Sequence, residues 1–379
     1  MLVHRLILKA RARKWRKAPG AEVPSVCVGN VTVGGTGKTP HTELILSLLQ
    51  ESDRWGNSQL AVLSRGYKRR SRGFQQVLRE SSAAFSGDEP LQIKKKFPAV
   101  TVAADKDRVE GCRFLVHPEL LQIRDPKEGK AAGMSRKMVR SARGCKSKEL
   151  IPSELIVLDD ALQYNKLRAS LNIMLVDWGR PVFSDRLLPF GRLRDLPSRL
   201  WDADIIIVTK CPHHMDNWEK VRMAEKLRIR GFEASSSTGT SPSGKPVTLL
   251  FSGIEYAPME PVFPEADIRY SYSKSAVLFS GIANDTPLKA WLSDSYKIAH
   301  AFSFPDHHRY TRADISEIES AVRHFPTSAL VTTEKDAQRV LDCPSIPDSI
   351  KQRLFYLPLK VFFSTPEELS LLKGVLDRL

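Results

Sequence analysis

The chain has 379 residues, 42% of them hydrophobic, and 58 Lys and Arg residues against 43 Asp and Glu residues give a formal net charge of +15. This length favours two or three folded domains, and the composition excludes a chain that is disordered throughout. Because no run approaches about 18 apolar residues, a membrane-spanning helix is not expected. Five scattered cysteines without a C-x-x-C pair predict reduced, intracellular cysteines rather than a zinc site.

The first 17 residues contain seven bases and no acid, together with apolar residues at helical spacing. This pattern predicts a basic amphipathic helix that lies on an anionic membrane surface. The alternative is an ordinary N-terminal helix that packs Leu2, Leu6 and Ile7 on the adjoining domain. A nucleic-acid-binding arm is a further alternative, although the chain lacks the interleaved aromatic and basic residues typical of RNA-binding surfaces.

The positive charge is local. Residues 1–17, 65–73 and 124–149 have net charges of +7, +5 and +6, so the rest of the chain sums to −3. A slightly acidic body with three basic patches does not predict a general nucleic-acid-binding protein. We therefore expect no nucleic-acid partner.

Short apolar runs alternate with helical patterns over the first two thirds of the chain. Strands are expected at 23–29, 60–63, 99–103, 155–158, 173–176 and 205–208, and helices at 42–49, 105–115 and 217–229. Continuous apolar strands separated by helices indicate a mostly parallel sheet covered on both faces. The segment 124–149 has few large apolar residues and is expected to be a mobile excursion between strands.

A Ser-, Gly- and Pro-rich loop at 234–245 precedes a β-rich section that ends near 266 and resembles a connector. Strands are then expected at 276–281, 297–302, 329–332 and 355–357, with a closing helix at 365–379. These elements predict a second, smaller α/β lobe.

A glycine-rich sequence lies between the first expected strand and the helix that follows it. Gly34, Gly35, Thr36, Gly37, Lys38 and Thr39 form GGTGKT, in the strand–loop–helix context of a phosphate-binding loop, although Thr32 stands where the strict pattern has glycine. Backbone amides and the helix N-terminus would bind phosphate, Lys38 would reach the β- and γ-phosphates, and Thr39 would offer its hydroxyl to Mg²⁺.

Two carboxylates, Asp159 and Asp160, end the strand at 155–158. At the carboxyl edge of a parallel sheet they would lie beside the phosphate-binding loop and hold Mg²⁺ directly or through water. Asp160 is also compatible with a helix N-cap. Together the two features predict a Mg²⁺-dependent enzyme that acts on a nucleoside triphosphate.

Candidate proton acceptors lie in two distant segments. Asp88 and Glu89 occur in the turn sequence GDEP at 87–90, and His307 and His308 follow Asp306 in the loop DHHRY at 306–310. A kinase that acts on a hydroxyl needs a base, and an Asp–His pair brought together by folding would serve. Alternatively, each segment is an ordinary capping or surface motif.

Nine ordered motifs resemble the tetraacyldisaccharide 4′-kinase family, the lipid A 4′-kinases of Gram-negative bacteria. They are GNVTVGGTGKTP (29–40), SRGY (64–67), GDEP (87–90), DRVEG (107–111), LDDALQY (158–164), LLPFGRLRD (187–195), FSGIAN (279–284), FPDHHRYT (304–311) and VTTEKDA (331–337). The resemblance covers nearly the whole chain. Ala161, where the family commonly has glycine, and the insert at 124–149 depart from the pattern.

The resemblance implies transfer of the ATP γ-phosphoryl group to the 4′-hydroxyl of a tetraacyldisaccharide 1-phosphate, a lipid A precursor, by a peripheral or monotopic protein at the cytoplasmic face of the inner membrane. It implies ATP and Mg²⁺ as cofactors. It also implies a P-loop NTPase-like α/β/α lobe, a β-ribbon connector and a second lobe. We accordingly expect a membrane-surface helix over 1–17, a kinase lobe over 18–245, a connector over 246–269 and a second α/β lobe over 270–379, in a monomer.

Carried over by motif, the loop from Thr32 and Val33 to Thr39 would bind ATP, and Thr39, Asp159 and Asp160 would bind the metal. Asp88 would act as the base and His307 as its partner, chosen over His308 because Asp306-His307 is the core of its motif. Glu89 and Arg108 would line the site, where Arg108 would neutralise phosphate charge. The bases from Arg65 to Arg72, which follow the SRGY motif, would face the substrate phosphate or the lipid headgroups.

Two other functions compete with this interpretation. GGTGKT also occurs in partitioning-type ATPases, although Val33 stands where that class usually has an extra lysine. A basic P-loop protein that binds nucleic acid is the second competitor.

Overall fold

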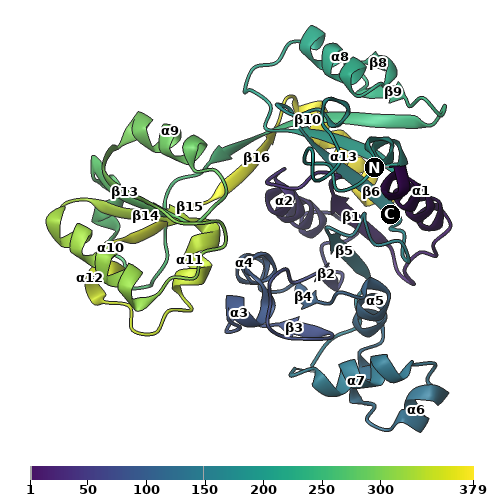
Figure 1. Ribbon diagram of the computed structural model, residues 1–379, viewed down its shortest axis with the longest axis horizontal. Coiled ribbons are helices and arrows are strands. Elements are labelled where there is room, and N and C mark those ends of the chain that lie inside the picture. The colour runs from purple at the N-terminus through teal and green to yellow at the C-terminus, as the bar shows by residue number, and fades with distance from the viewer. Residues whose placement is uncertain (1, 148) are drawn as a thin grey trace.

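The computed structural model describes residues 2–147 and 149–379, and they form two α/β lobes (Figure 1). The first lobe has an eleven-stranded sheet and the second a five-stranded sheet. The strands of the first sheet are β1 (Ser25–Gly29), β2 (Leu60–Ser64), β3 (Gln75–Val77), β4 (Thr101–Ala104), β5 (Leu155–Asp159), β6 (Leu171–Asp177), β7 (Ile205–Thr209), β8 (Arg230–Glu233), β9 (Thr238–Thr240), β10 (Pro246–Tyr256) and β16 (Leu359–Phe363). Those of the second are β11 (Glu260–Pro261), β12 (Ser275–Ser280), β13 (Lys297–Ser303), β14 (Ala329–Thr333) and β15 (Leu354–Leu357).

Helices cover both sheets. They are α1 (Leu2–Arg16), α2 (Lys38–Gln50), α3 (Ala83–Ser86), α4 (Asp88–Lys96), α5 (Arg108–Val116), α6 (Pro126–Ala131), α7 (Arg136–Gly144), α8 (Asn217–Lys226), α9 (Thr286–Ser295), α10 (Arg312–His324), α11 (Glu334–Val340), α12 (Asp348–Lys351) and α13 (Pro366–Asp377). The expected mostly parallel α/β architecture with a second, smaller α/β lobe is confirmed.

The parallel centre of the first sheet runs in the order β4-β2-β5-β1-β6-β7-β10. β1 lies between β5 and β6, so the loop after β1 emerges beside the carboxyl end of β5. In a parallel sheet this edge is where connecting loops gather and ligands bind. The topology therefore brings the glycine-rich loop and the two terminal carboxylates of β5 together.

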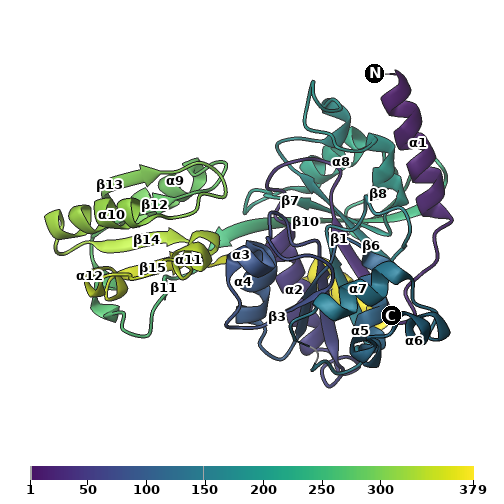
Figure 2. The same ribbon diagram turned by 60° about the horizontal axis from the view of Figure 1, so that its bottom comes forward.

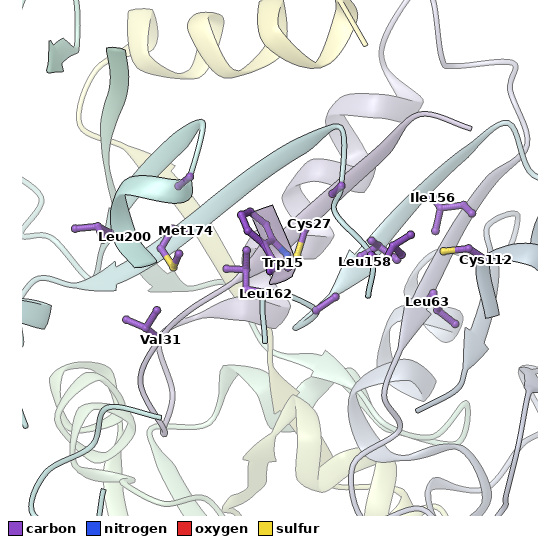
Figure 3. Packing of buried hydrophobic residues seen from close by; sticks show 14 of the residues in the cluster. Trp15, Cys27, Val31, Leu63, Cys112, Ile156, Leu158, Leu162, Met174 and Leu200 are labelled. Carbon is purple, nitrogen blue, oxygen red and sulfur yellow. The ribbon is translucent and has the colours of Figure 1, made fainter. Parts of the chain in front are cut away.

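Two hydrophobic clusters pack on opposite faces of this sheet. One joins Trp15 of α1 to Cys27, Leu158, Leu162 and other residues that Figure 3 shows at close range. The other joins the apolar side of α2 to α13 through Leu46, Leu372 and Leu376. The continuous apolar strands predicted from sequence are thus buried on both faces.

The link between the lobes differs from the expected connector over 246–269. The strand β10 starts in the first sheet, where it pairs with β7, and its second half pairs with β16 in antiparallel register from Ser252↔Phe363 to Tyr256↔Leu359. The second strand of this ribbon therefore comes from near the end of the chain. In Figures 1 and 2 the ribbon runs between the two bodies.

The segment after β16 also departs from the expected boundaries. The closing helix α13, assigned from sequence to the second lobe, packs on the first: Leu372 and Leu376 lie in its core, and Trp55 Nε1 donates to Leu376 O at 3.0 Å. The assignment of the whole of 270–379 to the second lobe is therefore wrong for α13. The chain crosses twice between the lobes.

The expected mobile excursion over 124–149 is instead a pair of short helices, α6 and α7. The side chain of Ser135 caps α7 by accepting from the Met138 amide, and Met138, Val139 and Ala142 are buried in the first-lobe core. Few apolar residues suffice because they share one face of a helix. Lys148 in this segment lies outside the described residues.

The N-terminal segment forms the expected helix, α1, but with a different buried face. Leu8, Ala12 and Trp15 are buried, whereas Leu6 and Ile7 are 55% and 52% exposed. The alternative in which Leu6 and Ile7 pack on the domain is therefore wrong; the side chain of Leu2 lies outside the described part. Across the described residues, no helix is both long and apolar enough to cross a membrane.

Candidate active site

The glycine-rich loop turns from β1 into α2. Gly34 and Gly37 have φ angles of 102° and 82°, a region that favours glycine, and Gly37 is the N-cap of α2. Asn30 Nδ2 donates to Thr36 Oγ1 at 2.6 Å, and Thr209 Oγ1 donates to Thr36 O at 3.0 Å. The loop is thus held from both sides, and α2 presents its N-terminal amides at the sheet edge, a geometry that binds phosphate.

Further contacts hold the two ends of this loop. Thr32 bridges to Leu193, and the Val33 amide donates to Arg192 O at 2.8 Å. Behind the loop, His41 Nδ1 lies 2.7 Å from Gly37 O, and burial lowers the pKa of His41 to about 4. A neutral His41 leaves Lys38 as the cation of the loop.

Asp159 and Asp160 lie at the expected edge, at the end of β5. Asp159 is buried; its Oδ2 accepts from Ser64 Oγ at 3.1 Å, and its carbonyl accepts from Arg108 Nη2 at 3.3 Å. Burial, together with the charges of Glu89 and Asp160, raises the pKa of Asp159 to about 7. A cation placed here would relieve that repulsion.

Asp160 has a φ of 52° and forms a two-pronged ion pair with Arg194, whose Nη1 lies 2.8 Å from Asp160 Oδ2. Burial opposes its ionisation, but the charges of Lys38 and Arg194 hold the pKa of Asp160 below its usual value. No helix of the described chain begins here, since β5 is followed through turns by β6. The N-cap alternative for Asp160 is therefore wrong.

The edge fits a Mg²⁺ ion of the kind that accompanies nucleotides. Among the residues that the structure describes, no group of three or more His, Cys, Asp or Glu side chains is arranged to hold a metal ion. Mg²⁺ in phosphate-transferring sites needs only one or two carboxylates, because phosphate oxygens and water complete its shell. Thr39, Asp159 and Asp160 would supply such a donor set, in which both oxygens of Asp160 also contact Arg194.

Asp88 meets His307 across the two lobes, 219 positions away in the sequence. Asp88 Oδ2 lies 3.1 Å from His307 Nδ1, and the same oxygen accepts from Arg339 Nε at 2.9 Å and Nη2 at 2.7 Å. Burial would raise the pKa of Asp88, but hydrogen bonding to His307 and the charge of Arg339 lower it below its usual value. Asp88 is therefore ionised at neutral pH.

The two histidines of the loop have different surroundings. His307 has a φ of 62°, which turns its ring toward Asp88, and Tyr67 lies edge-on to it at 5.6 Å between ring centroids. His308 stacks on Phe304 and lies 3.0 Å from Asp314 through Nε2. Of the two, His307 is the one that the structure brings to Asp88.

Asp88 and Glu89 do not cap α4. Gly87, with a φ of 96°, is the N-cap and provides no side-chain hydrogen bond, while a Cβ at Gly87 would meet Gly66 Cα at 3.3 Å. This close approach places the 65–67 loop against the GDEP turn. Both carboxylates are directed to the second lobe, so the plain capping interpretation of GDEP is wrong.

Sequence reasoning missed three bases of this region, Lys335, Arg339 and Arg194. Lys335 Nζ lies 2.6 Å from Glu89 Oε1, and its charge, with that of Lys38, lowers the pKa of Glu89. Arg339 joins Asp88 to Asp336, with Nη1 2.7 Å from Asp336 Oδ1. The signal was available: Lys335 lies in the VTTEKDA motif, and Arg339 is one helical turn further along α11.

The remaining candidates, Arg108 and Arg65, behave differently. Arg108 is buried and donates to the carbonyls of Asp105 and Asp159, so it supports the end of β5 from behind. Burial lowers its pKa. Arg65 is exposed on the loop after β2 and has no ion pair with a described residue.

Removing Arg339 is expected to move the pH dependence of the reaction. In R339Q the pKa of Asp88 should rise, because an opposite charge next to a carboxyl typically lowers its pKa by about 1–3 units. The acidic limb of a plot of kcat/KM against pH should therefore shift upward by about one unit, and R339K should restore part of the shift. R323Q, at an exposed arginine of α10 paired with Glu319, is the matched control; an unmoved limb in R339Q would contradict the assigned role.

Comparison with known proteins places this geometry in context. The family model described as tetraacyldisaccharide-1-P 4′-kinase matches residues 1–377. The chain is 36% identical over 354 residues to a tetraacyldisaccharide 4′-kinase of Parabacteroides distasonis, covering 92% of this chain and 83% of the relative. It is 33% identical over 368 residues to that of Porphyromonas gingivalis, covering 94% and 87%.

A solved structure shares the fold. The crystal structure of LpxK from Aquifex aeolicus in complex with ATP aligns with a TM-score of 0.66, covering 99% of this chain and 96% of that one at 23% identity. At this identity the likeness concerns the arrangement of both lobes rather than individual residues.

Proposed function

The chain belongs to the tetraacyldisaccharide 4′-kinase family, and from that membership we propose how its two lobes share the reaction. The enzyme transfers the γ-phosphoryl group of ATP to the 4′-hydroxyl of a tetraacyldisaccharide 1-phosphate, the acceptor on which lipid A biosynthesis builds. The observation that carries the proposal is the contact of Asp88 in one lobe with His307 in the other, at 3.1 Å.

In this proposal the first lobe binds the nucleotide. The amides of residues 32–39 and the N-terminus of α2 surround the phosphates, and Lys38 contacts the β- and γ-phosphates. Thr39, Asp159 and Asp160 would hold Mg²⁺, which would neutralise charge on those phosphates. Arg194 fixes the orientation of Asp160, and Arg108 supports Asp159 from the buried side.

Asp88 accepts the proton of the 4′-hydroxyl. As the hydroxyl oxygen bonds to the γ-phosphorus, the bond from that phosphorus to the β,γ-bridging oxygen breaks and ADP leaves. Asp88 Oδ2 is held by His307 and Arg339, so Oδ1 remains for the substrate. His307 and Arg339 act as positioning residues for this carboxylate. Glu89 and Lys335 join the lobes beside it, and Arg65 lies on the exposed loop next to the GDEP turn.

Turnover of ATP in the presence and absence of lipid tests the proposal against a partitioning-type ATPase. We expect ATP consumption only when tetraacyldisaccharide 1-phosphate and Mg²⁺ are both present. Rapid hydrolysis that ignores the lipid would contradict the kinase function. Since one chain provides both halves of the Asp88–His307 pair, the proposal needs only a monomer.

We propose that α1 binds an anionic membrane surface, the cytoplasmic face of the inner membrane. Its exposed side presents Leu6 and Ile7, while Leu8, Ala12 and Trp15 attach it to the lobe. Arg199 lies 4.2 Å from the ring centroid of Trp15. Such a helix would hold lipid and enzyme at one surface.

The double variant L6Q/I7Q is expected to float less with vesicles that contain phosphatidylglycerol. It removes exposed apolar area, worth about 1.5–3 kcal/mol per fully buried side chain, and leaves the buried face of α1 intact. Flotation assays on wild type and variant measure the loss, and unchanged thermal unfolding checks the fold. Deletion of residues 2–17 would also remove the buried Trp15, so it is a poorer test than the double variant. Equal flotation of L6Q/I7Q and wild type would contradict the proposal that α1 binds the membrane.

A further inference from the structure

Two of the three basic stretches lie side by side in the structure. The loop at 65–73 continues into Phe74 and Gln75, which bond to the insert: Phe74 N donates to Ser141 Oγ at 2.8 Å, and Gln75 Nε2 donates to Gly144 O at 2.8 Å. A Cβ at Gly73 would meet Ser141 Oγ at 2.6 Å. These contacts join the loop to α7. We give the name basic band to seven of the exposed bases of the joined segments: Lys68, Arg70, Arg72, Arg136, Arg140, Arg143 and Lys146.

The basic band is poorly neutralised by the protein itself. Within residues 2–147 and 149–379, Arg70, Arg72, Arg136 and Arg140 form no ion pair. Asp107, the nearby acid, is instead paired with Lys137 at 2.8 Å. Like charges crowded on one face repel one another, so this arrangement lowers stability unless an anionic partner binds it.

The fold forces these charges outward. Met138, Val139 and Ala142 bury the opposite side of α7, and the spacing of Arg136 and Arg140 puts both on one exposed face. Helix α7 therefore presents its bases to the surroundings.

The other end of the basic band reaches the catalytic pair. Tyr67, 60% exposed, precedes Lys68 and lies edge-on to His307, and the 65–67 loop packs on the GDEP turn. The Lys68 ammonium lies 5.6 Å from the centroid of the Tyr67 ring. An aromatic residue beside a base suits the interfacial region of a bilayer. A surface that bound the band would thus lie next to the site where the lipid hydroxyl reacts.

We infer that the basic band, formed by the insert and the 65–73 loop, is a second membrane-docking surface that binds anionic phospholipid headgroups beside the active site. The inference rests on the proposed function, which requires a lipid acceptor. A nucleic-acid surface would need several exposed stacking aromatics, whereas Tyr67 is the only exposed aromatic side chain among the described residues from 65 to 147.

The triple variant R72Q/R136Q/R140Q tests the inference, with K274Q/K297Q/R312Q as the matched control. The control removes three exposed bases of the second lobe that likewise form no ion pair with described residues. Because each base near an anionic surface contributes on the order of 1 kcal/mol, the test variant should bind phosphatidylglycerol-containing vesicles at least about tenfold more weakly than wild type. The control should bind within about twofold of wild type.

Transfer to the same lipid acceptor in neutral detergent micelles separates this inference from the proposed function. We expect wild type and the triple variant to have equal kcat there, since none of the three arginines contacts the catalytic pair. Vesicle binding that is unchanged in the triple variant, or lowered equally in the control, would overturn the docking surface. A triple variant that loses binding to duplex DNA but keeps its binding to vesicles would also overturn it. Wild type inactive in micelles would instead contradict the kinase function.

Discussion

Replacement of Lys38 with alanine is expected to lower kcat/KM for phosphoryl transfer by about 10²- to 10³-fold or more, the usual cost of one charge-stabilising group at a transferring centre. Lys38 begins α2 directly after the left-handed Gly37, and its charge is felt by Glu89, Asp159 and Asp160. It is thus the cation between the phosphate-binding loop and the acidic edge. Steady-state transfer assays measure the effect.

The control for K38A is K226A, at an exposed lysine of α8 in the same lobe. K38A and K226A should unfold at similar temperatures, because neither side chain is part of the core. Full activity of K38A at saturating ATP would refute the role assigned to Lys38. Full activity of K226A is expected.

The second large effect is expected for the pair that joins the lobes. D88N and H307N should each lower kcat by about 10²- to 10⁴-fold, the usual contribution of general-base catalysis, while ATP affinity changes little. The reason is that the nucleotide binds the first lobe at 32–39, whereas Asp88 and His307 act on the acceptor hydroxyl. Single-turnover transfer and nucleotide titration on the same variants distinguish the two steps.

H308N provides the matched control, because His308 differs from His307 by one position and contacts Asp314 rather than Asp88. It should retain kcat within a fewfold of wild type. A loss of kcat in H308N as large as that in H307N would contradict the assignment of His307 as the partner of Asp88. A loss of ATP binding in D88N in proportion to kcat would contradict the assignment of Asp88 as the base.

The first sheet was largely predictable because its strands are buried on both faces. Runs such as residues 155–158 and 205–208 are continuously apolar and stop at polar residues, a local signal that survives without tertiary information. The glycine-rich loop was predictable for a similar reason. The spacing of its glycines, lysine and threonine and its position between a strand and a helix can both be recognised within one short stretch of sequence.

Features that depend on distant contacts were not predictable. Nothing local shows that α13 packs on α2 rather than on the second lobe, or that β16 returns to pair with β10. In α6 and α7, a few buried residues at helical spacing outweigh a strongly basic composition. The contact of Asp88 with Arg339 follows from lobe placement. The residues offered Asp88 only as one of several candidate bases, the resemblance singled it out, and Arg339 was missed.

The structure shows where the basic residues behind the net charge of +15 lie. Two of the three basic stretches, 65–73 and 124–149, are held side by side by hydrogen bonds from Phe74 and Gln75 to α7, and their exposed bases extend from Lys68, next to Tyr67, to α7. The ion pairs Glu89–Lys335 and Asp88–Arg339 use other bases to join the lobes. The bases that join the lobes are therefore distinct from those of the basic band.

The most direct measurement is the chemical position of the phosphate after reaction with γ-³²P-ATP, Mg²⁺ and tetraacyldisaccharide 1-phosphate. We expect labelled lipid in an amount equal to the ADP formed, with the new phosphate at the 4′-position by NMR of the isolated product, and no labelled lipid with D88N. Release of labelled inorganic phosphate with the lipid unlabelled, or label at another hydroxyl, would contradict the account.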